Sequence, residues 1–239
     1  MQQNFFNWNR LMTTFARPNT PPLESGDRLT RHEFERRYTA MPHLKKAELI
    51  EGVVYVPSPL RFNSHGQPHG DLIIWLGVYK VATPGVKLAD NATVRLDLDN
   101  EPQPDAVLLI DERLGGQARI SQDDYIEGAP ELVAEVVAAS SAAIDLYDKK
   151  RAYRRNGVRE YIVWQILENK LDWFSLQNDE YVLLEPDADG IIKSFVFPGL
   201  WLNVTALLAG EMTTVLALLQ QGLNSQEHVE FVQYLSQHF

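Results

Sequence analysis

An almost unbroken apolar run, residues 132–139, is interrupted by a single carboxylate, Glu135. A run of this length and composition is typical of a β-strand that is covered on both faces. An ionised carboxylate inside such a strand is costly unless a partner group or a metal ion compensates its charge. The run therefore predicts a buried strand, and it marks Glu135 as a residue whose presence needs an explanation.

The composition allows one sizeable core, since 45% of the 239 residues are hydrophobic. No stretch approaches the roughly 20 apolar residues of a membrane helix, and the first residues lack a basic flank followed by an apolar segment. We therefore expect no membrane partner and, by default, a cytoplasmic location. Because the sequence has no Cys, any metal ion must be held by Asp, Glu, His or backbone oxygen.

The formal net charge of −10 argues against a protein that coats nucleic acid non-specifically, because that binding depends on Lys and Arg. The charge is compatible with a nucleic-acid enzyme that clusters acidic residues at a metal site and keeps its basic residues local. Basic residues are in fact grouped in three segments, 28–37, 45–46 and 149–155.

Hydrophobic periodicity and turn residues predict a mixed α/β order, with strands flanked by helices and much of the sheet antiparallel. Thr30 and Glu33 form a capping box, while Ser140 or Ser141 and Gly157 bound a later helix. Helices are expected at about 30–40, 69–82, 141–157 and from 204 onward, and strands at 46–50, 53–56, within 86–99, and at 105–110, 131–139, 159–167, 170–177 and 180–186.

Three regions follow from this order. Residues 1–27 contain several prolines with little periodicity and are interpreted as an N-terminal arm. Residues 28–210 form the main domain, and residues 211–239 are interpreted as a helical C-terminal extension, of which 225–239 is a separable addition.

Two carboxylates and a lysine stand in an order that suits phosphodiester chemistry. Asp105 opens a buried strand after Pro104, Glu135 lies in the next apolar strand, and Lys149 lies on the helix that follows. Two carboxylates on neighbouring strands can chelate Mg²⁺, which keeps several waters at such sparse sites. A nearby lysine can orient the attacking water and neutralise the charge that develops on the phosphate. The sequence contains neither a GxSxG motif nor a phosphate-binding glycine loop.

Over residues 45–208 the sequence resembles the Uma-two family of restriction-endonuclease-like proteins, within the PD-(D/E)xK nuclease superfamily. The resemblance is carried by "PD" before an apolar strand, by "PELVAEVV" and by "DKKRAYRRNGVREYIVW". It implies a restriction-endonuclease-like α/β fold, with a mixed central sheet flanked by helices. It also implies a Mg²⁺-dependent endonuclease, for which Mn²⁺ would be a substitute, with DNA as its substrate.

The resemblance assigns roles residue by residue. It makes Asp105 and Glu135 the metal ligands, but Val137 stands where the superfamily usually has its lysine. In this family the lysine lies on the following helix, where Lys149 fits and Lys150 is the nearest rival.

Further residues match family positions or lie beside the expected site. Glu48, in the first hairpin, is an additional metal ligand in this interpretation. His69, or less favourably His65, is an accessory histidine that opens the next helix. Arg154 and Arg155 are candidates for contact with the DNA backbone.

Simpler interpretations stand beside these. Asp105 can be a turn residue, Glu135 can have a structural partner, and Asp145 with Lys149 can form a surface ion pair four residues apart. Tyr153 is expected to pack on the sheet, and Trp164 is expected in the core.

The sequence thus predicts a metal-dependent endodeoxyribonuclease, in which Asp105, Glu135 and Lys149 are catalytic. A homodimer would help it to embrace a duplex. The alternative of a different class is a catalytically inactive nuclease-fold domain that serves in binding or assembly.

Overall fold

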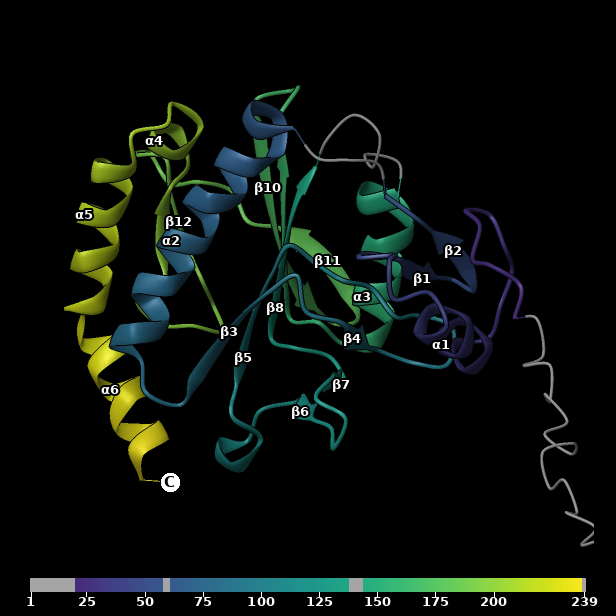
Figure 1. Ribbon diagram of the computed structural model, residues 1–239. Coiled ribbons are helices and arrows are strands. Elements are labelled where there is room, and N and C mark those ends of the chain that lie inside the picture. The colour runs from purple at the N-terminus through teal and green to yellow at the C-terminus, as the bar shows by residue number, and fades with distance from the viewer. Residues whose placement is uncertain (1–19, 58–60, 138–143, 238–239) are drawn as a thin grey trace, which may run out of the picture.

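The computed structural model describes residues 20–57, 61–137 and 144–237. The N-terminal arm lies largely outside these residues, as do the expected helix caps Ser140 and Ser141. A six-stranded sheet runs through the middle of the molecule, in the order β11-β10-β9-β8-β5-β3 (Figure 1). Its strands are β3 (Val86–Asp90), β5 (Ala106–Ile110), β8 (Leu132–Val137), β9 (Glu160–Gln165), β10 (Lys170–Gln177) and β11 (Glu180–Leu183).

The sheet is mixed, because β8 and β9 pair in parallel and the other neighbours pair antiparallel. A parallel pair requires a crossover connection over one face of the sheet. The described part of this connection is a π-helical turn, η3 (Ile144–Lys149), followed by α3 (Lys150–Asn156). The crossover brings α3 over the face on which Glu135 projects.

Alternate residues of the central strands face different apolar clusters, as the period of a strand requires. Leu132 and Val136 of β8 join the largest cluster with residues of α2 (Gln67–Ala82) and α5 (Met212–Leu223). Val133 and Val137 face the opposite side, where they pack with Tyr153 of α3. Glu135 shares the face of Val133 and Val137, so its carboxylate lies on the α3 side of the sheet.

A smaller unit covers the site from the α3 side. It contains α1 (Arg31–Thr39) and a hairpin of β1 (Glu48–Ile50) and β2 (Val53–Tyr55) around its own apolar cluster. The hairpin turns at Glu51 and Gly52, which have φ angles of 52° and 72° and so lie in the left-handed region that suits a two-residue turn. The predicted hairpin and its turn are therefore confirmed.

The C-terminal helices pack on the opposite face of the sheet from α3. The helices are α4 (Val204–Leu208), α5 and α6 (Gln226–Ser236). Val215 and Leu219 of α5 and Leu235 of α6 are fully buried in the largest cluster. His228 of α6 lies against Thr83 after α2, with Nε2 3.0 Å from the Thr83 Oγ1. The division of the chain into a main domain and a C-terminal extension stays a prediction.

The main predicted elements are present, and the differences lie at their ends. The expected helix at 69–82 begins at Gln67 and is preceded by a π-helical turn, η1 (Phe62–Gly66). Gly157 ends α3 with a φ angle of 85°, as expected of a C-terminal stop. The segments that periodicity did not predict are too short to show a period: η2 (Glu112–Leu114) and the strands β6 (Arg119–Ile120), β7 (Ile126–Glu127), β12 (Ile191–Lys193) and β13 (Trp201–Asn203). The predicted strands within 86–99 are β3 and β4 (Val94–Arg95).

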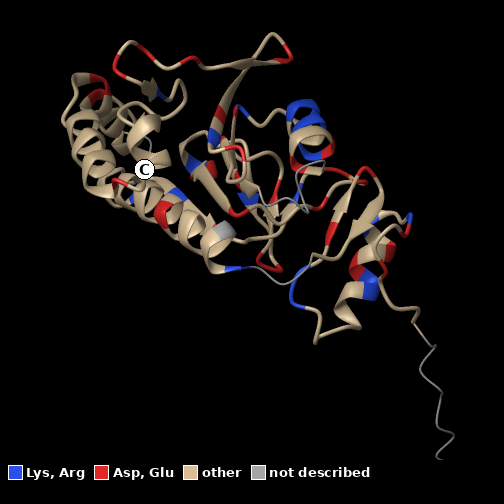
Figure 2. Ribbon diagram, turned by 90° about the horizontal axis from the view of Figure 1, so that it is seen from above, with Lys and Arg blue, Asp and Glu red and all other residues tan. Residues whose placement is uncertain are grey.

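Charge is distributed unevenly over these layers. Figure 2 shows Lys and Arg concentrated on α3, which carries four basic residues, while α5 has no charged residue. In the parts of the chain that the structure describes, no helix is both long and apolar enough to cross a bilayer.

Candidate active site

Asp105 and Glu135 come together because of the register between β5 and β8. Ala106 is paired with Ala134 in this antiparallel ladder, so the next positions along it are Asp105 and Glu135. Residues opposite each other in an antiparallel pair project from the same face. The main-chain amide of Val136 donates a 2.8 Å hydrogen bond to Oδ2 of Asp105, which ties the aspartate to the strand that carries Glu135.

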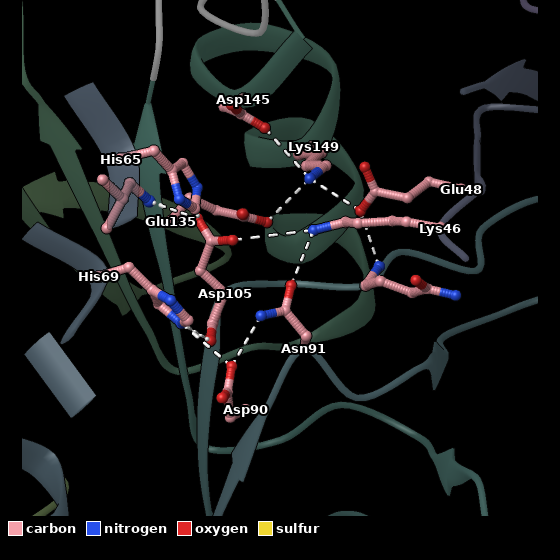
Figure 3. A network of polar contacts seen from close by, with 12 residues as sticks. Lys46, Glu48, His65, His69, Asp90, Asn91, Asp105, Glu135, Asp145 and Lys149 are labelled. Carbon is pink, nitrogen blue, oxygen red and sulfur yellow. Dashed lines mark hydrogen bonds and ion pairs between the residues drawn. The ribbon is translucent and has the colours of Figure 1, made fainter. Parts of the chain in front are cut away.

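Asp105 is buried and is held in its ionised form by its neighbours (Figure 3). Nε2 of His65 lies 3.2 Å from Oδ2, and Nζ of Lys46 lies 3.7 Å from Oδ1. Burial opposes ionisation, but the hydrogen bond from His65 and the charge of Lys46 lower the pKa of Asp105 to about 2. Because an ionised carboxylate only accepts hydrogen bonds, Nε2 of His65 carries the proton in this contact. Nδ1 of His65 is buried and has no hydrogen-bond partner among the residues that the structure describes.

His69 contacts the main-chain carbonyl of Asp105 and the carboxylate of Asp90, not the carboxylates of Asp105 and Glu135. Its Nε2 lies 3.0 Å from the carbonyl oxygen of Asp105 and 3.1 Å from Oδ1 of Asp90. His65 and His69 are four residues apart, and their ring centroids are 5.6 Å apart. Of the two histidines, the one that the sequence ranked lower is thus the one bound to the Asp105 carboxylate.

Lys149 lies at the centre of three carboxylates. Its Nζ is 2.9 Å from Oε1 of Glu48, 3.0 Å from Oε1 of Glu135 and 3.1 Å from Oδ1 of Asp145. Burial alone would lower the pKa of Lys149, but the three carboxylates together hold it well above its usual value. The predicted ion pair between Asp145 and Lys149 is present, but it is buried rather than on the surface.

Glu135 has two donors on the same oxygen. Oε1 accepts hydrogen bonds from Lys149 and, at 2.9 Å, from the hydroxyl group of Tyr153. Burial raises the pKa of Glu135 to about 8 against the attraction of Lys149, and the nearby carboxylates act in the same direction as burial. Tyr153 is fully buried, as expected of a residue that packs on the sheet, and it has this polar contact in addition. Trp164 is buried in the largest cluster, which confirms its predicted place in the core.

Glu48 joins the site from the first hairpin. Its Oε1 accepts a 2.7 Å hydrogen bond from the amide of Gln103, in the segment before Asp105, as well as the contact from Lys149. The hairpin is therefore linked both to the strand of Asp105 and to the crossover helix. Glu48 and Asp105 are far apart in the sequence, so this link cannot be seen there. It arises from the packing of the hairpin against the sheet.

Three predicted residues contact groups other than Asp105, Glu135 and Glu48. Lys150 has its Nζ 3.4 Å from the centroid of the Phe174 ring, on β10. Arg154 contacts Oε1 of Glu180 at 2.6 Å, and Arg155 contacts Oε1 of Glu51 at 2.8 Å. Their predicted roles, in catalysis for Lys150 and in DNA contact for the two arginines, stay predictions.

Sequence reasoning did not single out Lys46 or Asn91. Lys46 stands two residues before Glu48 in the sequence and extends into the site, where its Nζ lies 3.1 Å from Oδ1 of Asn91 (Figure 3). Asn91 follows β3 with a φ angle of 52°, a conformation that Asn tolerates better than most residues. The spacing of Lys46 and Glu48, which places both on the same side of an extended segment, was the available signal.

The oxygen donors of the site suit a hard cation such as Mg²⁺. Asp105 and Glu135 offer carboxylate oxygens on the same face of two adjacent strands, and Mg²⁺ is commonly held by one or two carboxylates and waters. Within the described residues, no group of three or more His, Asp or Glu side chains is arranged to hold a metal ion. It is the chemistry of the two carboxylates alone that suits Mg²⁺. Lys149 and Tyr153 both contact the same oxygen of Glu135, Oε1.

Comparison with known proteins bears on the family and the fold of the chain. The model of the family Uma2, described as "Putative restriction endonuclease", matches residues 31–205. A solved structure from Anabaena variabilis, described as a putative nuclease belonging to DUF820, has a TM-score of 0.55 and 15% sequence identity. The alignment covers 73% of this chain and 96% of that one, and at this identity it shows the fold. No curated protein matches the chain. The family match spans most of the sequence, and the chain belongs to the Uma2 family.

Proposed function

We propose that the chain is a Mg²⁺-dependent endonuclease that hydrolyses phosphodiester bonds of DNA. The observation that carries this proposal is the pair Asp105 and Glu135, which project from one face of adjacent strands with cationic side chains beside them. The family description and the nuclease-like fold support hydrolysis of a nucleic acid. Mn²⁺ is proposed as a substitute for Mg²⁺.

Asp105 and Glu135 would hold the metal ion, and Glu48 is an additional candidate ligand. When bound, Mg²⁺ supplies Lewis-acid stabilisation of the charge that develops on the phosphate. The remaining residues keep the ligands in place, because His65 and the amide of Val136 hold Asp105 while Tyr153 contacts Glu135. Such support of metal ligands is worth about 10–100-fold in metal affinity.

The role predicted for Lys149, orientation of the attacking water, stays a prediction. Its contacts with Glu48, Glu135 and Asp145 favour a role in positioning these carboxylates. The four basic residues of α3 lie on an otherwise acidic protein and offer a local surface for the DNA backbone. The homodimer and the cytoplasmic location also stay predictions.

The test is cleavage of supercoiled plasmid DNA by the full chain, with Mg²⁺ and with EDTA. We expect nicking that requires the metal ion and that Asp105→Asn and Glu135→Gln abolish, with circular dichroism spectra like that of the wild type. If either variant nicks DNA as fast as the wild type, the site is assigned to the wrong residues.

One observation favours the alternative of an inactive binding or assembly module, namely that Lys149 already compensates the charge of Glu135. Calorimetric titration with Mn²⁺ separates the two proposals. An active site gives a binding heat that is lost in Glu135→Gln, whereas an inactive domain gives no binding heat with the wild type.

A further inference from the structure

The site contains a second lysine, Lys46, whose surroundings differ from those of Lys149. Lys46 lies in the segment before β1 and extends between Asp105 and Asn91 (Figure 3). Its Nζ is 3.1 Å from Oδ1 of Asn91 and 3.7 Å from Oδ1 of Asp105. The two lysines thus approach the same pair of carboxylates from different elements, Lys46 at Asp105 and Lys149 at Glu135.

The ammonium group of Lys149 is enclosed by carboxylates. An ammonium group has three N–H donors, and Nζ of Lys149 lies within 3.1 Å of three carboxylate oxygens, those of Glu48, Glu135 and Asp145. Its side chain is 3% exposed. Contact with a phosphate oxygen would require Lys149 to abandon a buried carboxylate, which is costly because the carboxylate would be left without its partner.

Lys46 has fewer close partners and more access to solvent than Lys149. In the described part of the chain, its one contact of hydrogen-bond length is that with Asn91, and its contact with Asp105 is longer. The side chain of Lys46 is 23% exposed. Asn91 holds the ammonium group, and Asp90 in turn accepts a 2.7 Å hydrogen bond from the Asn91 amide, so that the group is oriented before a substrate arrives.

We propose that Lys46 is the catalytic lysine of this site and that it contacts the phosphate under attack, whereas Lys149 is a positioning residue for Glu48, Glu135 and Asp145. The inference rests on the proposed function, because it assigns a residue to the same hydrolysis. Lys46 would supply the positive charge that the apolar Val137 of β8 cannot supply.

The step balances without a proton from Lys46. Water adds to phosphorus, the ester P–O bond breaks, and the products are a phosphate monoester and a free hydroxyl group. The proton of the attacking water passes to solvent, and the leaving oxygen receives a proton from solvent. Lys46 stays an ammonium ion throughout and stabilises the negative charge on the non-bridging oxygens by hydrogen bonding.

The experiment compares Lys46→Met with Lys45→Met, its exposed neighbour, in single-turnover cleavage of supercoiled plasmid with Mg²⁺. We expect Lys46→Met to lower the cleavage rate by about 100-fold or more, the usual effect of removing one such donor, and Lys45→Met to leave it unchanged. Lys46→Arg, which keeps the positive charge, should recover a large part of the rate. A purely structural role for Lys46 would not be rescued in this way.

Titration with Mn²⁺ gives a second readout that does not depend on activity. Lys46→Met should bind Mn²⁺ as tightly as Lys45→Met or more tightly, because a cation beside Asp105 has been removed. If the wild type cleaves DNA and Lys46→Met cleaves as fast as Lys45→Met, this inference is overturned and the proposed function stands. A wild type that neither binds Mn²⁺ nor cleaves DNA overturns both.

Discussion

The amide of Val136 donates a hydrogen bond to the carboxylate of Asp105, so the strand that carries Glu135 also fixes the carboxylate opposite it. The two predicted metal ligands are therefore linked through the main chain of β8 and cannot move independently. The geometry of the pair depends on the sheet, and the side chains from α2, α3 and the first hairpin then set its charge.

His65 should be needed for tight metal binding. His65→Phe keeps an aromatic ring at this position but removes one of the two donors to Oδ2 of Asp105, so that the amide of Val136 alone holds this oxygen. We expect the Mn²⁺ dissociation constant, measured by calorimetry, to rise about 10–100-fold. His43→Phe, at an exposed position, is the control and should bind as the wild type does. Equal dissociation constants in the two variants would exclude the proposed role of His65.

Lys149 should be needed for the fold. Lys149→Met leaves Glu48, Glu135 and Asp145 buried without their common cation. We expect the free energy of unfolding, measured with urea, to fall by about 3–5 kcal/mol.

The control for this change is the neighbouring Lys150→Met. It removes a cation–π contact with Phe174 and should cost about 1 kcal/mol or less. Adding Glu48→Gln to Lys149→Met should restore part of the stability, because it removes one of the stranded charges. If Lys149→Met is as stable as Lys150→Met, the three contacts contribute little to the fold.

Glu160 should make the protein less stable as the pH rises. It is fully buried at the start of β9 and accepts hydrogen bonds from the amide of Phe195 at 2.7 Å and the hydroxyl of Ser194 at 2.8 Å. Burial raises its pKa from 4.5 to about 7, against the effect of these hydrogen bonds. Between these two pH values the folded state retains a proton that the unfolded state has lost. The free energy of unfolding therefore falls with rising pH, by on the order of 3 kcal/mol over this window.

Urea unfolding between pH 4.5 and 7.5 measures this effect. Glu160→Gln has no proton to retain at this position, so its stability should fall less steeply with pH than that of the wild type. Glu168→Gln, at an exposed position, should keep the slope of the wild type. Parallel curves for the two variants would show that Glu160 does not titrate in this range.

The C-terminal helices should be part of the cooperative core. Leu235 of α6 is fully buried, so Leu235→Ala should lower the free energy of unfolding by about 2–5 kcal/mol in a single transition. Val229→Ala, on the exposed side of the same helix, should change it little. Two separate unfolding transitions would instead show that the C-terminal region is a separable addition.

Much of the fold could be predicted from the sequence, because its long elements have a clear period. Continuous apolar runs indicated β5 and β8, the helical spacing of apolar residues indicated α2, and apolar strands separated by turns at glycine and asparagine indicated the hairpin and the meander from β9 to β11. The short strands β6 and β7 could not be predicted, since two residues carry no period. The single carboxylate within the apolar run, Glu135, also indicated where the candidate site lies.

The surroundings of the candidate residues could not be predicted in the same way. Asp145 and Lys149 had the spacing of a surface pair, and only the packing of the hairpin over α3 shows that their contact is buried. Lys46 was missed because its neighbours, Asp105 and Asn91, come from segments far from it in sequence. A local pattern reports the element that carries a side chain, whereas contacts between elements depend on how the layers meet.

The parallel pairing of β8 and β9 also bears on how such a site can change during evolution. The chain must return over the face of Glu135 to reach β9, so a lysine that arises on the returning segment can contact this carboxylate. Glu135 then has a cationic partner without a lysine on its own strand, so the strand position can become apolar, as at Val137, while the carboxylate stays paired. A lysine on the returning segment therefore relaxes what the strand itself must carry, and a catalytic cation can come from another element of the fold.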